Sequence, residues 1–332
     1  MRSSTFSKTA KILFLLVAVL FLSATLAAAK PITIKIGHCN APGKTDPYHL
    51  TATYFAEALE EIAPGQFKVQ IFPARQLGDE KEMIEGIGFG TIDMGVITNS
   101  PISRISEPFQ VNDMPFIYPS EEYAHKILDG PVGQKLLKTL EAKNIIGLGF
   151  AEGGFRQMIN NVRPVKVAGD VSGIKWRVMP NPVYIEMFRS LGGNAVPMPW
   201  GEVFTAIQQG TIDGLEIPLA VIFNNGFYEV AKYCSLTNHT YSALGVLMSK
   251  RKFDKLTSEQ QDAVRKAARK AIDRERIQNM KNVKETVAKL EAKGMKVNSV
   301  ADFKPFQAKV TKVYDKFRPN IGDDIFNQVL SK

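Results

Sequence analysis

The sequence contains few of the residues that build redox, metal or catalytic centres. Its 332 residues include two cysteines, Cys39 and Cys234, and four histidines. No C-x-x-C is present, and the histidines never fall at metal-ligand spacing. G-x-S-x-G, H-E-x-x-H and paired-carboxylate patterns are also missing. We therefore expect no catalytic residue, no metal site and no cofactor.

The two cysteines leave their pairing open. An oxidising compartment permits a disulfide, but spacing alone does not show that Cys39 and Cys234 meet. Two separate thiols are the simpler expectation.

Long apolar runs are also scarce, and the one at the N-terminus has the features of a secretory signal peptide. Arg2, Lys8 and Lys11 precede the apolar run from Ile12 to Leu22, which small residues follow up to Ala29. The run is shorter than the roughly 20 apolar residues that a membrane span needs. No cysteine lies near the cleavage site, so we expect no lipid anchor. The sequence predicts cleavage near Ala29 and export to the periplasm.

The charge balance is basic but not extreme. The formal net charge of +9 falls to +6 without residues 1–29, which hold three basic residues and no acidic one. No basic run interleaves with aromatic residues, so we expect no nucleic-acid partner. A modest positive charge instead favours encounter with small organic anions.

The N-terminal part of the mature chain alternates strand and helix patterns. Strands are predicted over 32–37, 67–72 and 92–97, with helices over 48–63 and from a cap at Asp79, and a further strand is predicted over 145–150. This rhythm predicts an α/β fold with a parallel, twisted sheet and helices on both faces.

A second strand–helix unit carries the strongest candidate for function. In the segment from Gly173 to Met179, alternation places Arg177 on the face opposite Trp176, and a helix is predicted over 184–191. Ligands bind at such junctions because strand ends and helix N-termini converge there. A cation at this point indicates an anionic small molecule; a solvated or structural charge is the alternative.

One very long helix is predicted near the C-terminus. No proline or glycine occurs from Thr257 to Lys293, Thr257 and Gln260 form a capping box, and Gly294 ends the helix. About 37 residues at about 1.5 Å each give about 55 Å. An apolar stripe is predicted at Ala263, Val264, Ala267, Ala271, Ile272, Val283, Val287 and Leu290. Its charged face is expected to be solvated; a coiled-coil partner is the alternative.

Three motifs in order resemble the solute-binding proteins of TRAP (tripartite ATP-independent periplasmic) transporters, of the DctP type. They are G-x-K-x-R-x-x-x-N-P at 173–182, V-P-M-P-W-x-E-V-F-x-A-I-Q-x-G at 196–210 and D-G-x-E-x-P at 213–218. F-P-A-R-Q-L-G-D at 72–79 and T-N-H at 237–239 also resemble the family. The resemblance runs from about Ile32 to Lys250, and the last eighty residues support it only through the long helix.

The resemblance implies a periplasmic-binding-protein-like fold, with two α/β lobes, a central ligand cleft and a long helix that spans both lobes. Lobe I is expected to contain 30–153 and about 242–281, and lobe II 154–241 and about 282–332. Closure is expected around hinges near Gly153 and His239. The implied function is an extracytoplasmic receptor that delivers an organic acid anion to a TRAP membrane permease.

The resemblance also implies a set of ligand-binding residues. Arg177 is expected to bind a ligand carboxylate through its planar fork of donors. Arg156 is the second arginine, with a salt bridge as the alternative role, and Asn181 is expected to donate from the same rim. Trp200 is expected to stack on the ligand or close the pocket, or else to pack in the core. Glu216 is expected to accept from ligand hydroxyls or to balance arginine charge.

The opposite wall is expected from the first loop and the end of the third strand, at Cys39, Asn40 and Asn99. Phe116 is expected to back that wall or to pack in the core. His239, in T-N-H, completes the expected ligand-binding set.

The ligand class follows from these side chains. Two arginines imply a carboxylate, and Glu216 suggests hydroxyls, so a sugar acid such as a uronate or an aldonate is expected, with a C4-dicarboxylate as the alternative. Ile217 replaces an asparagine common in the family, so no single known ligand carries over. A secreted enzyme acting on a carboxylated substrate, and a binding subunit of an ATP-driven importer or sensor, are the other classes considered.

Overall fold

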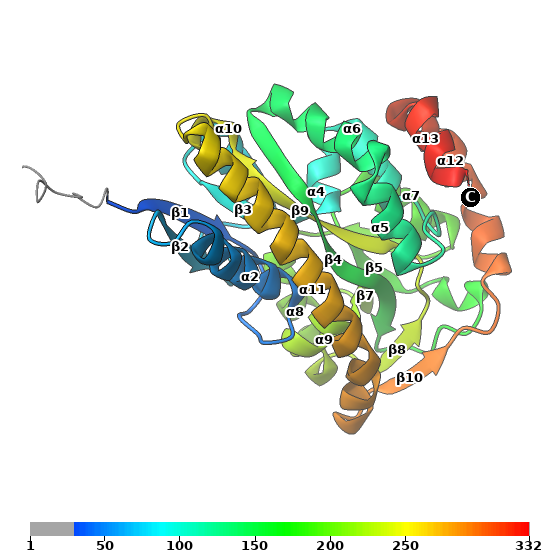
Figure 1. The fold of residues 1–332 in the computed structure, drawn as a ribbon. Helices are drawn as coiled ribbons and strands as arrows, with labels where there is room; N and C mark the ends of the chain where they lie inside the picture. The colour runs from blue at the N-terminus through cyan, green and yellow to red at the C-terminus, as the bar shows by residue number, and fades with distance from the viewer. Residues whose placement is uncertain (1–29, 332) are drawn as a thin grey trace, which may run out of the picture. The chain divides into compact units, whose positions relative to one another are not determined.

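Ten strands form one connected sheet in the computed structural model, which describes residues 30–331 (Figure 1). The strands are β1 (Ile32–Gly37), β2 (Phe67–Phe72), β3 (Met94–Thr98), β4 (Ile145–Asn160), β5 (Lys175–Val178), β6 (Asn194–Pro197), β7 (Gly214–Pro218), β8 (Tyr233–Leu236), β9 (Tyr241–Ser249) and β10 (Lys296–Ser299). Their order is β2-β1-β3-β9-β4-β7-β5-β6, with β8 also paired to β4, and β10 to β8. The predicted signal peptide and its cleavage site lie outside the described residues.

Helices connect these strands and cover the sheet. The α-helices are α2 (Pro47–Ile62), α3 (Glu80–Phe89), α4 (Asn99–Ser103), α5 (Glu121–Asp129), α6 (Pro131–Thr139), α7 (Pro182–Ser190), α8 (Trp200–Gln208), α9 (Leu219–Asn224), α10 (Lys250–Phe253), α11 (Ser258–Ala292), α12 (Lys304–Ile321) and α13 (Asp323–Leu330). Short 3₁₀ helices are η1 (Glu107–Asp113), η2 (Leu140–Lys143), η3 (Ala168–Val171) and η4 (Phe227–Glu229). Within 30–331, no helix combines the length and the apolar character needed to cross a membrane.

The predicted α/β class and the first strands and helices are confirmed, but the sheet is mixed and not parallel throughout. β1 runs parallel to β3, and β5 runs parallel to both β6 and β7. β9, however, lies antiparallel between β3 and β4, and β4 is antiparallel to β7 and β8. β8 and β9 pair with β4 one after the other, Ser235 opposite Met158 and Tyr241 opposite Phe155, so β9 continues along β4 in the antiparallel direction that β8 already has.

β4 is longer than predicted and joins the two halves of the sheet. The predicted strand over 145–150 continues to Asn160, and its register shifts between Glu152 and Gly154. Gly154 has a φ of +89°, a conformation that glycine adopts without steric cost. β4 pairs with β9 as far as Phe155 and with β7 from Arg156 onward, which places Arg156 beside the end of β7.

α11 matches the predicted long helix closely. It spans Ser258–Ala292, and both hydrogen bonds of the Thr257–Gln260 capping box are present. Figure 1 shows it running along α2 and across β4, both of which it contacts. The first part of the predicted apolar stripe is buried, but Val283 and Val287 are only half-buried.

In the middle of α11 the buried positions are polar, since they meet polar groups of β4. Glu275 accepts from the Glu152 N–H at 2.9 Å, and Asn279 donates to a carboxylate oxygen of Glu152 at 3.0 Å. A continuous apolar stripe was therefore the wrong expectation for this part of the helix.

The C-terminal helices contact both halves of the chain. α12 packs against η1 and α7, and α13 packs against η1 and α6, where Lys135 and Asp324 form an ion pair at 2.6 Å. From Thr33 onward the described chain forms one compact unit. The division into two lobes, with 282–332 in lobe II, stays a prediction.

Candidate ligand-binding site

A cavity of about 440 Å³ lies where several strands of the sheet end. Thr98 ends β3, Met179 follows β5 and Pro218 ends β7, and all three line the cavity. Helices α4, α7 and α9 begin at or close to these strand ends. Strand ends and helix N-termini thus converge on one space, the arrangement expected for a ligand site in an open α/β sheet.

Arg177 enters the cavity from β5, and its terminal nitrogens remain available. Its side chain is 2% exposed, and its Nε–H donates to the carbonyl oxygen of Met198 at 2.9 Å. Among the described residues, neither Nη atom has a hydrogen-bond partner. Burial lowers the pKa of Arg177 to about 10, an effect that Glu216 opposes and Arg156 adds to. A buried guanidinium without a bonded carboxylate favours an anionic ligand.

Trp200 begins α8 beside Arg177. The arginine Cζ lies 5.9 Å from the centroid of the indole ring, and the ring also packs on Phe227 at a centroid distance of 5.4 Å. The side chain is half-buried and lines the cavity. Trp200 therefore combines the two roles considered for it, as a pocket wall and as a packed residue.

Arg156 lies at the same cavity, but its charge is already matched by Glu216. Its Nε donates to one carboxylate oxygen of Glu216 and its Nη2 to the other at 3.0 Å. Its Nη1 donates to the Ser242 hydroxyl at 3.3 Å. Burial disfavours both charges, yet their mutual attraction holds the pKa of Arg156 above and that of Glu216 below its ordinary value. The geometry favours the salt-bridge alternative for Arg156 and charge balance for Glu216.

Glu216 and His239 lie behind Arg156 and outside the cavity lining. Both side chains are 0% exposed, and His239 Nε2 is 3.4 Å from Glu216. The other ring nitrogen of His239 is 2.8 Å from the Thr237 hydroxyl. Burial lowers the pKa of His239. These two residues support Arg156, and neither side chain reaches the cavity as expected for a ligand-binding group.

The two predicted asparagines, Asn181 and Asn99, are also outside the cavity lining, because local hydrogen bonds use their side chains. The Asn181 oxygen caps α7, and its amide donates to Ser103 at 2.7 Å and Asp113 at 2.9 Å. The Asn99 amide donates to the carbonyl oxygen of Phe109 at 2.9 Å. Both are structural in this geometry.

Phe116 lines a different hollow from the one predicted. It packs beside Phe303 at a centroid distance of 6.2 Å, in a hollow that also contains Phe155. Its φ is +57°, and its N–H donates to the carbonyl oxygen of His239 at 2.7 Å. Phe116 is not among the residues that line the ligand cavity, so its expected role behind that wall is not supported by this geometry.

Cys39 and Asn40 line the cavity, as predicted for the first loop. The Asn40 amide donates to Asp46 at 2.8 Å. The Cys39 thiol lies 3.3 Å from Asp79, and burial raises its pKa. Cys39 and Cys234 are both free and buried, so they form no disulfide in this structure.

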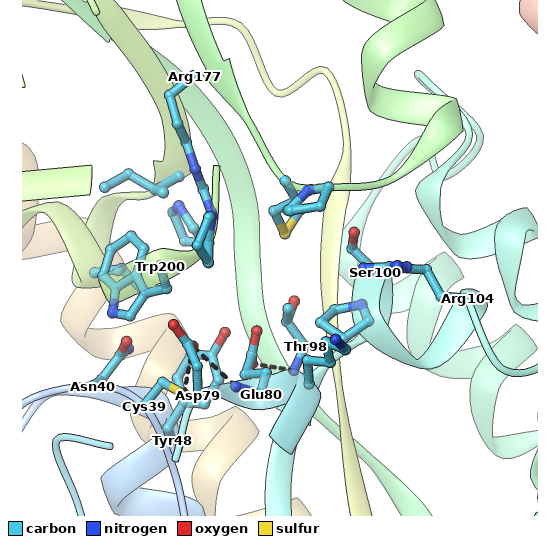
Figure 2. Close-up of a pocket in the computed structure, with 18 of the residues that line it drawn as sticks. Cys39, Asn40, Tyr48, Asp79, Glu80, Thr98, Ser100, Arg104, Arg177 and Trp200 are labelled. Atoms are coloured by element: carbon cyan, nitrogen blue, oxygen red, sulfur yellow. Dashed lines mark hydrogen bonds between the residues drawn. The ribbon is translucent and has the colours of Figure 1, made fainter. Parts of the chain in front are cut away.

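Two acidic residues of the cavity were missed as ligand-binding candidates. Asp79, predicted only as a helix cap, does cap α3 and also accepts from the Gly201 N–H at 3.0 Å. Glu80 accepts from the Thr98 N–H at 2.8 Å, and burial raises its pKa to about 7. Figure 2 shows both carboxylates on the side of the cavity opposite Arg177. The available signal was their position in the sequence, because Asp79 ends the F-P-A-R-Q-L-G-D motif and Glu80 follows it directly.

Within residues 30–331, no group of three or more His, Cys, Asp or Glu side chains is placed to hold an ion.

Known proteins are similar to this chain over most of its length. The DctP family model, described as bacterial extracellular solute-binding protein, family 7, matches residues 36–320. The 2,3-diketo-L-gulonate-binding periplasmic protein YiaO of Escherichia coli (strain K12) is 35% identical over 86% of this chain and 88% of its own length. The C4-dicarboxylate-binding periplasmic protein DctP of Rhodobacter capsulatus is 33% identical over 80% of each.

A solved structure is similar over nearly the whole described fold. The sugar acid binding protein DctPAm from Advenella mimigardefordensis strain DPN7T, in complex with galactonate, has a TM-score of 0.87 at 33% identity and covers 91% of this chain and 97% of its own. The chain belongs to the DctP family, the solute-binding proteins of TRAP transporters. The predicted family and fold class are confirmed.

Proposed function

We propose that this protein is a periplasmic receptor for a sugar acid that carries one carboxylate, such as an aldonate or a uronate. Arg177 binds the carboxylate, and the receptor delivers the ligand to a TRAP membrane permease. The observation that carries the proposal is that Arg177 is buried in the cavity with two nitrogens that have no partner within residues 30–331, whereas the charge of Arg156 is matched by Glu216. One buried cation without a counter-charge suits one carboxylate.

The relatives support the ligand class. YiaO is named for binding 2,3-diketo-L-gulonate, and the Advenella protein was solved with galactonate, both of them sugar acids. The Rhodobacter relative is named for C4-dicarboxylates, so the family includes both classes. The pairing of Arg156 with Glu216 favours the sugar acid, because a dicarboxylate would need that arginine for its second charge.

Delivery of the ligand requires that the cavity opens and closes. Hydrogen bonds across the edge of the cavity could form when it closes and break when it opens. Asp79 accepts from the Gly201 N–H at 3.0 Å, and Thr45 donates to Asn224 at 2.9 Å. Both pairs join segments of the expected lobe I to segments of the expected lobe II. We infer a closed state that these hydrogen bonds stabilise and that ligand binding favours.

We infer further that the receptor returns its ligand unchanged. The polar groups at the cavity wall include arginines, a lysine, carboxylates, hydroxyls, an amide and the Cys39 thiol. The thiol lies 3.3 Å from Asp79, but burial and the neighbouring carboxylates raise its pKa, so it stays protonated and is not an activated nucleophile. An activated nucleophile of the kind expected in a hydrolase or lyase is therefore not found among the described lining residues.

A ligand screen tests the proposal. The purified mature protein is examined by thermal shift against galactonate, glucuronate, erythronate and succinate, and hits are measured by calorimetry. We expect the sugar acids to bind with a stoichiometry near one per chain and succinate to bind more weakly. Tight binding of succinate, with no binding of any sugar acid, would overturn the proposed ligand class.

A further inference from the structure

The wall opposite Arg177 offers one carboxylate oxygen to the ligand. Glu80 is the first residue of α3, and its Oε1 accepts from the Thr98 N–H at 2.8 Å, which fixes the carboxyl group. Its Oε2 has no hydrogen-bond partner among the described residues. Figure 2 shows the side chain pointing into the cavity beside Asp79.

Asp79 adds negative charge at this wall but little acceptor capacity. Its Oδ1 accepts from the Glu80 N–H at 2.9 Å and faces the Cys39 thiol at 3.3 Å, while its Oδ2 accepts from the Gly201 N–H at 3.0 Å. Glu80 is therefore the group at this wall that can accept a new hydrogen bond without losing an existing one.

We propose that Glu80 is a specificity-determining residue, which accepts a hydrogen bond from a ligand hydroxyl and disfavours a second carboxylate at that position. This rests on the proposed function and deepens it. A hydroxyl is a donor and matches the open Oε2, whereas a ligand carboxylate is an acceptor only and carries the same charge as Glu80 and Asp79. Like charges placed against each other at a binding site discriminate between ligands.

The cations near this wall do not cancel its charge. Arg156 is paired with Glu216, and Arg177 points from the far side of the cavity. Lys81 and Arg104 also line the cavity but are exposed to solvent. Water screens an exposed charge far more than a buried one, so neither residue replaces a buried partner for a second carboxylate.

The test is the variant Glu80→Gln, measured by calorimetry with galactonate and with succinate at about pH 8.5, where the Glu80 carboxyl group of the wild type is ionised although burial raises its pKa to about 7. Glutamine keeps one oxygen for the Thr98 N–H, removes the charge and replaces the open acceptor with a donor. We expect galactonate to bind at least tenfold more weakly and succinate to bind at least tenfold more tightly. Glu85→Gln, on the exposed side of the same helix, is the matched control and should bind both like the wild type.

The outcomes separate this inference from the proposed function. If the wild type binds galactonate but Glu80→Gln leaves the ratio of the two affinities unchanged, the role of Glu80 is overturned and the sugar-acid receptor stands. If the wild type binds no sugar acid, both fail. Should Glu80→Gln not fold, Glu80→Asp serves instead. It keeps the charge but shortens the reach, so galactonate affinity should fall while succinate stays excluded; unchanged binding of galactonate overturns the inference.

Discussion

The Nε–H of Arg177 donates to the carbonyl oxygen of Met198 at 2.9 Å, and this bond holds the guanidinium plane in one orientation. The two Nη atoms are then free to contact both oxygens of one carboxylate. Such bidentate pairs depend on the planar fork of arginine, which lysine lacks.

Arg177→Lys should therefore weaken ligand binding although the charge is kept. Mismatching one partner of a buried charged pair costs about 2–5 kcal/mol, which is at least about tenfold in affinity. Arg177→Ala should bind still more weakly, but its thermal midpoint without ligand should not fall, because the buried charge that it removes has no bonded carboxylate. Calorimetry and thermal unfolding measure the two effects. A lysine variant that binds like the wild type would show that Arg177 does not bind the carboxylate.

Glu216→Gln should lower the stability of the protein, since it leaves Arg156 buried without its counter-charge. Breaking a buried ion pair from one side costs about 3–5 kcal/mol. Urea unfolding should show this loss, and the double variant Arg156→Met, Glu216→Leu should lose less than the single variant. If Glu216→Gln unfolds at the wild-type urea concentration, the pair is not a structural requirement.

Stability should also depend on pH through buried carboxyl groups, with Asp46 as the clearest case. Asp46 is 0% exposed, and burial raises its pKa from 3.8 to about 7, against hydrogen bonds from His49 and Asn40. The folded protein thus binds a proton that the unfolded chain has lost between about pH 4 and 7. This contribution to stability is present below pH 4 and is lost as the pH rises through 7.

Asp46→Asn removes that titration. The fall in unfolding free energy from pH 5 to pH 8 should be smaller in the variant by on the order of 2 kcal/mol. Denaturant unfolding at the two pH values measures it, with the exposed Asp315→Asn as the control that leaves the wild-type slope unchanged. An identical slope in Asp46→Asn would mean that Asp46 stays ionised in the folded protein.

The sequence indicated where strands and helices lie better than the direction in which the strands run. It also indicated which charged residues matter better than which side chains they pair with. Alternation identifies β1, β2 and β3, but it is the same for parallel and antiparallel strands, so β9 and the mixed sheet were not foreseen. Arg177 was found because it stands at a strand–helix junction within a motif, at 173–182, that resembles the TRAP solute-binding proteins. Glu80 was missed because an acid in the first turn of a helix also suits the helix dipole.

Which side chains form ion pairs or hydrogen bonds depends on the fold, and the local sequence pattern does not show it. Glu216 lies 60 residues from Arg156, and only the pairing of β4 with β7 brings them together. The same holds for Asn181, whose motif position suggested a ligand donor but whose amide contacts Ser103 and Asp113 from a distant segment.

Hydrogen bonds at the cavity edge should control ligand release. Thr45→Val and Asn224→Ala each remove the 2.9 Å bond between Thr45 and Asn224, so each should speed dissociation. One hydrogen bond contributes about 0.5–1.5 kcal/mol, which corresponds to roughly two- to tenfold in rate. Stopped-flow tryptophan fluorescence measures release, and the double variant should be no faster than the faster single one.

Small-angle scattering should also show a smaller radius of gyration with ligand, and an unchanged radius at saturation would count against closure.

Ligand recovered from the protein should be chemically intact. A receptor that delivers its ligand needs complementarity to the ground state and no extra stabilisation of a transition state. We propose that the donors of Arg177, the wall at Trp200 and the acceptor at Glu80 together hold a ligand without activating a bond. Mass spectrometry after long incubation and denaturation should recover galactonate unchanged, at about one molecule per chain. Multiple-turnover conversion that disappears in Arg177→Ala would instead identify an enzyme and overturn the receptor function.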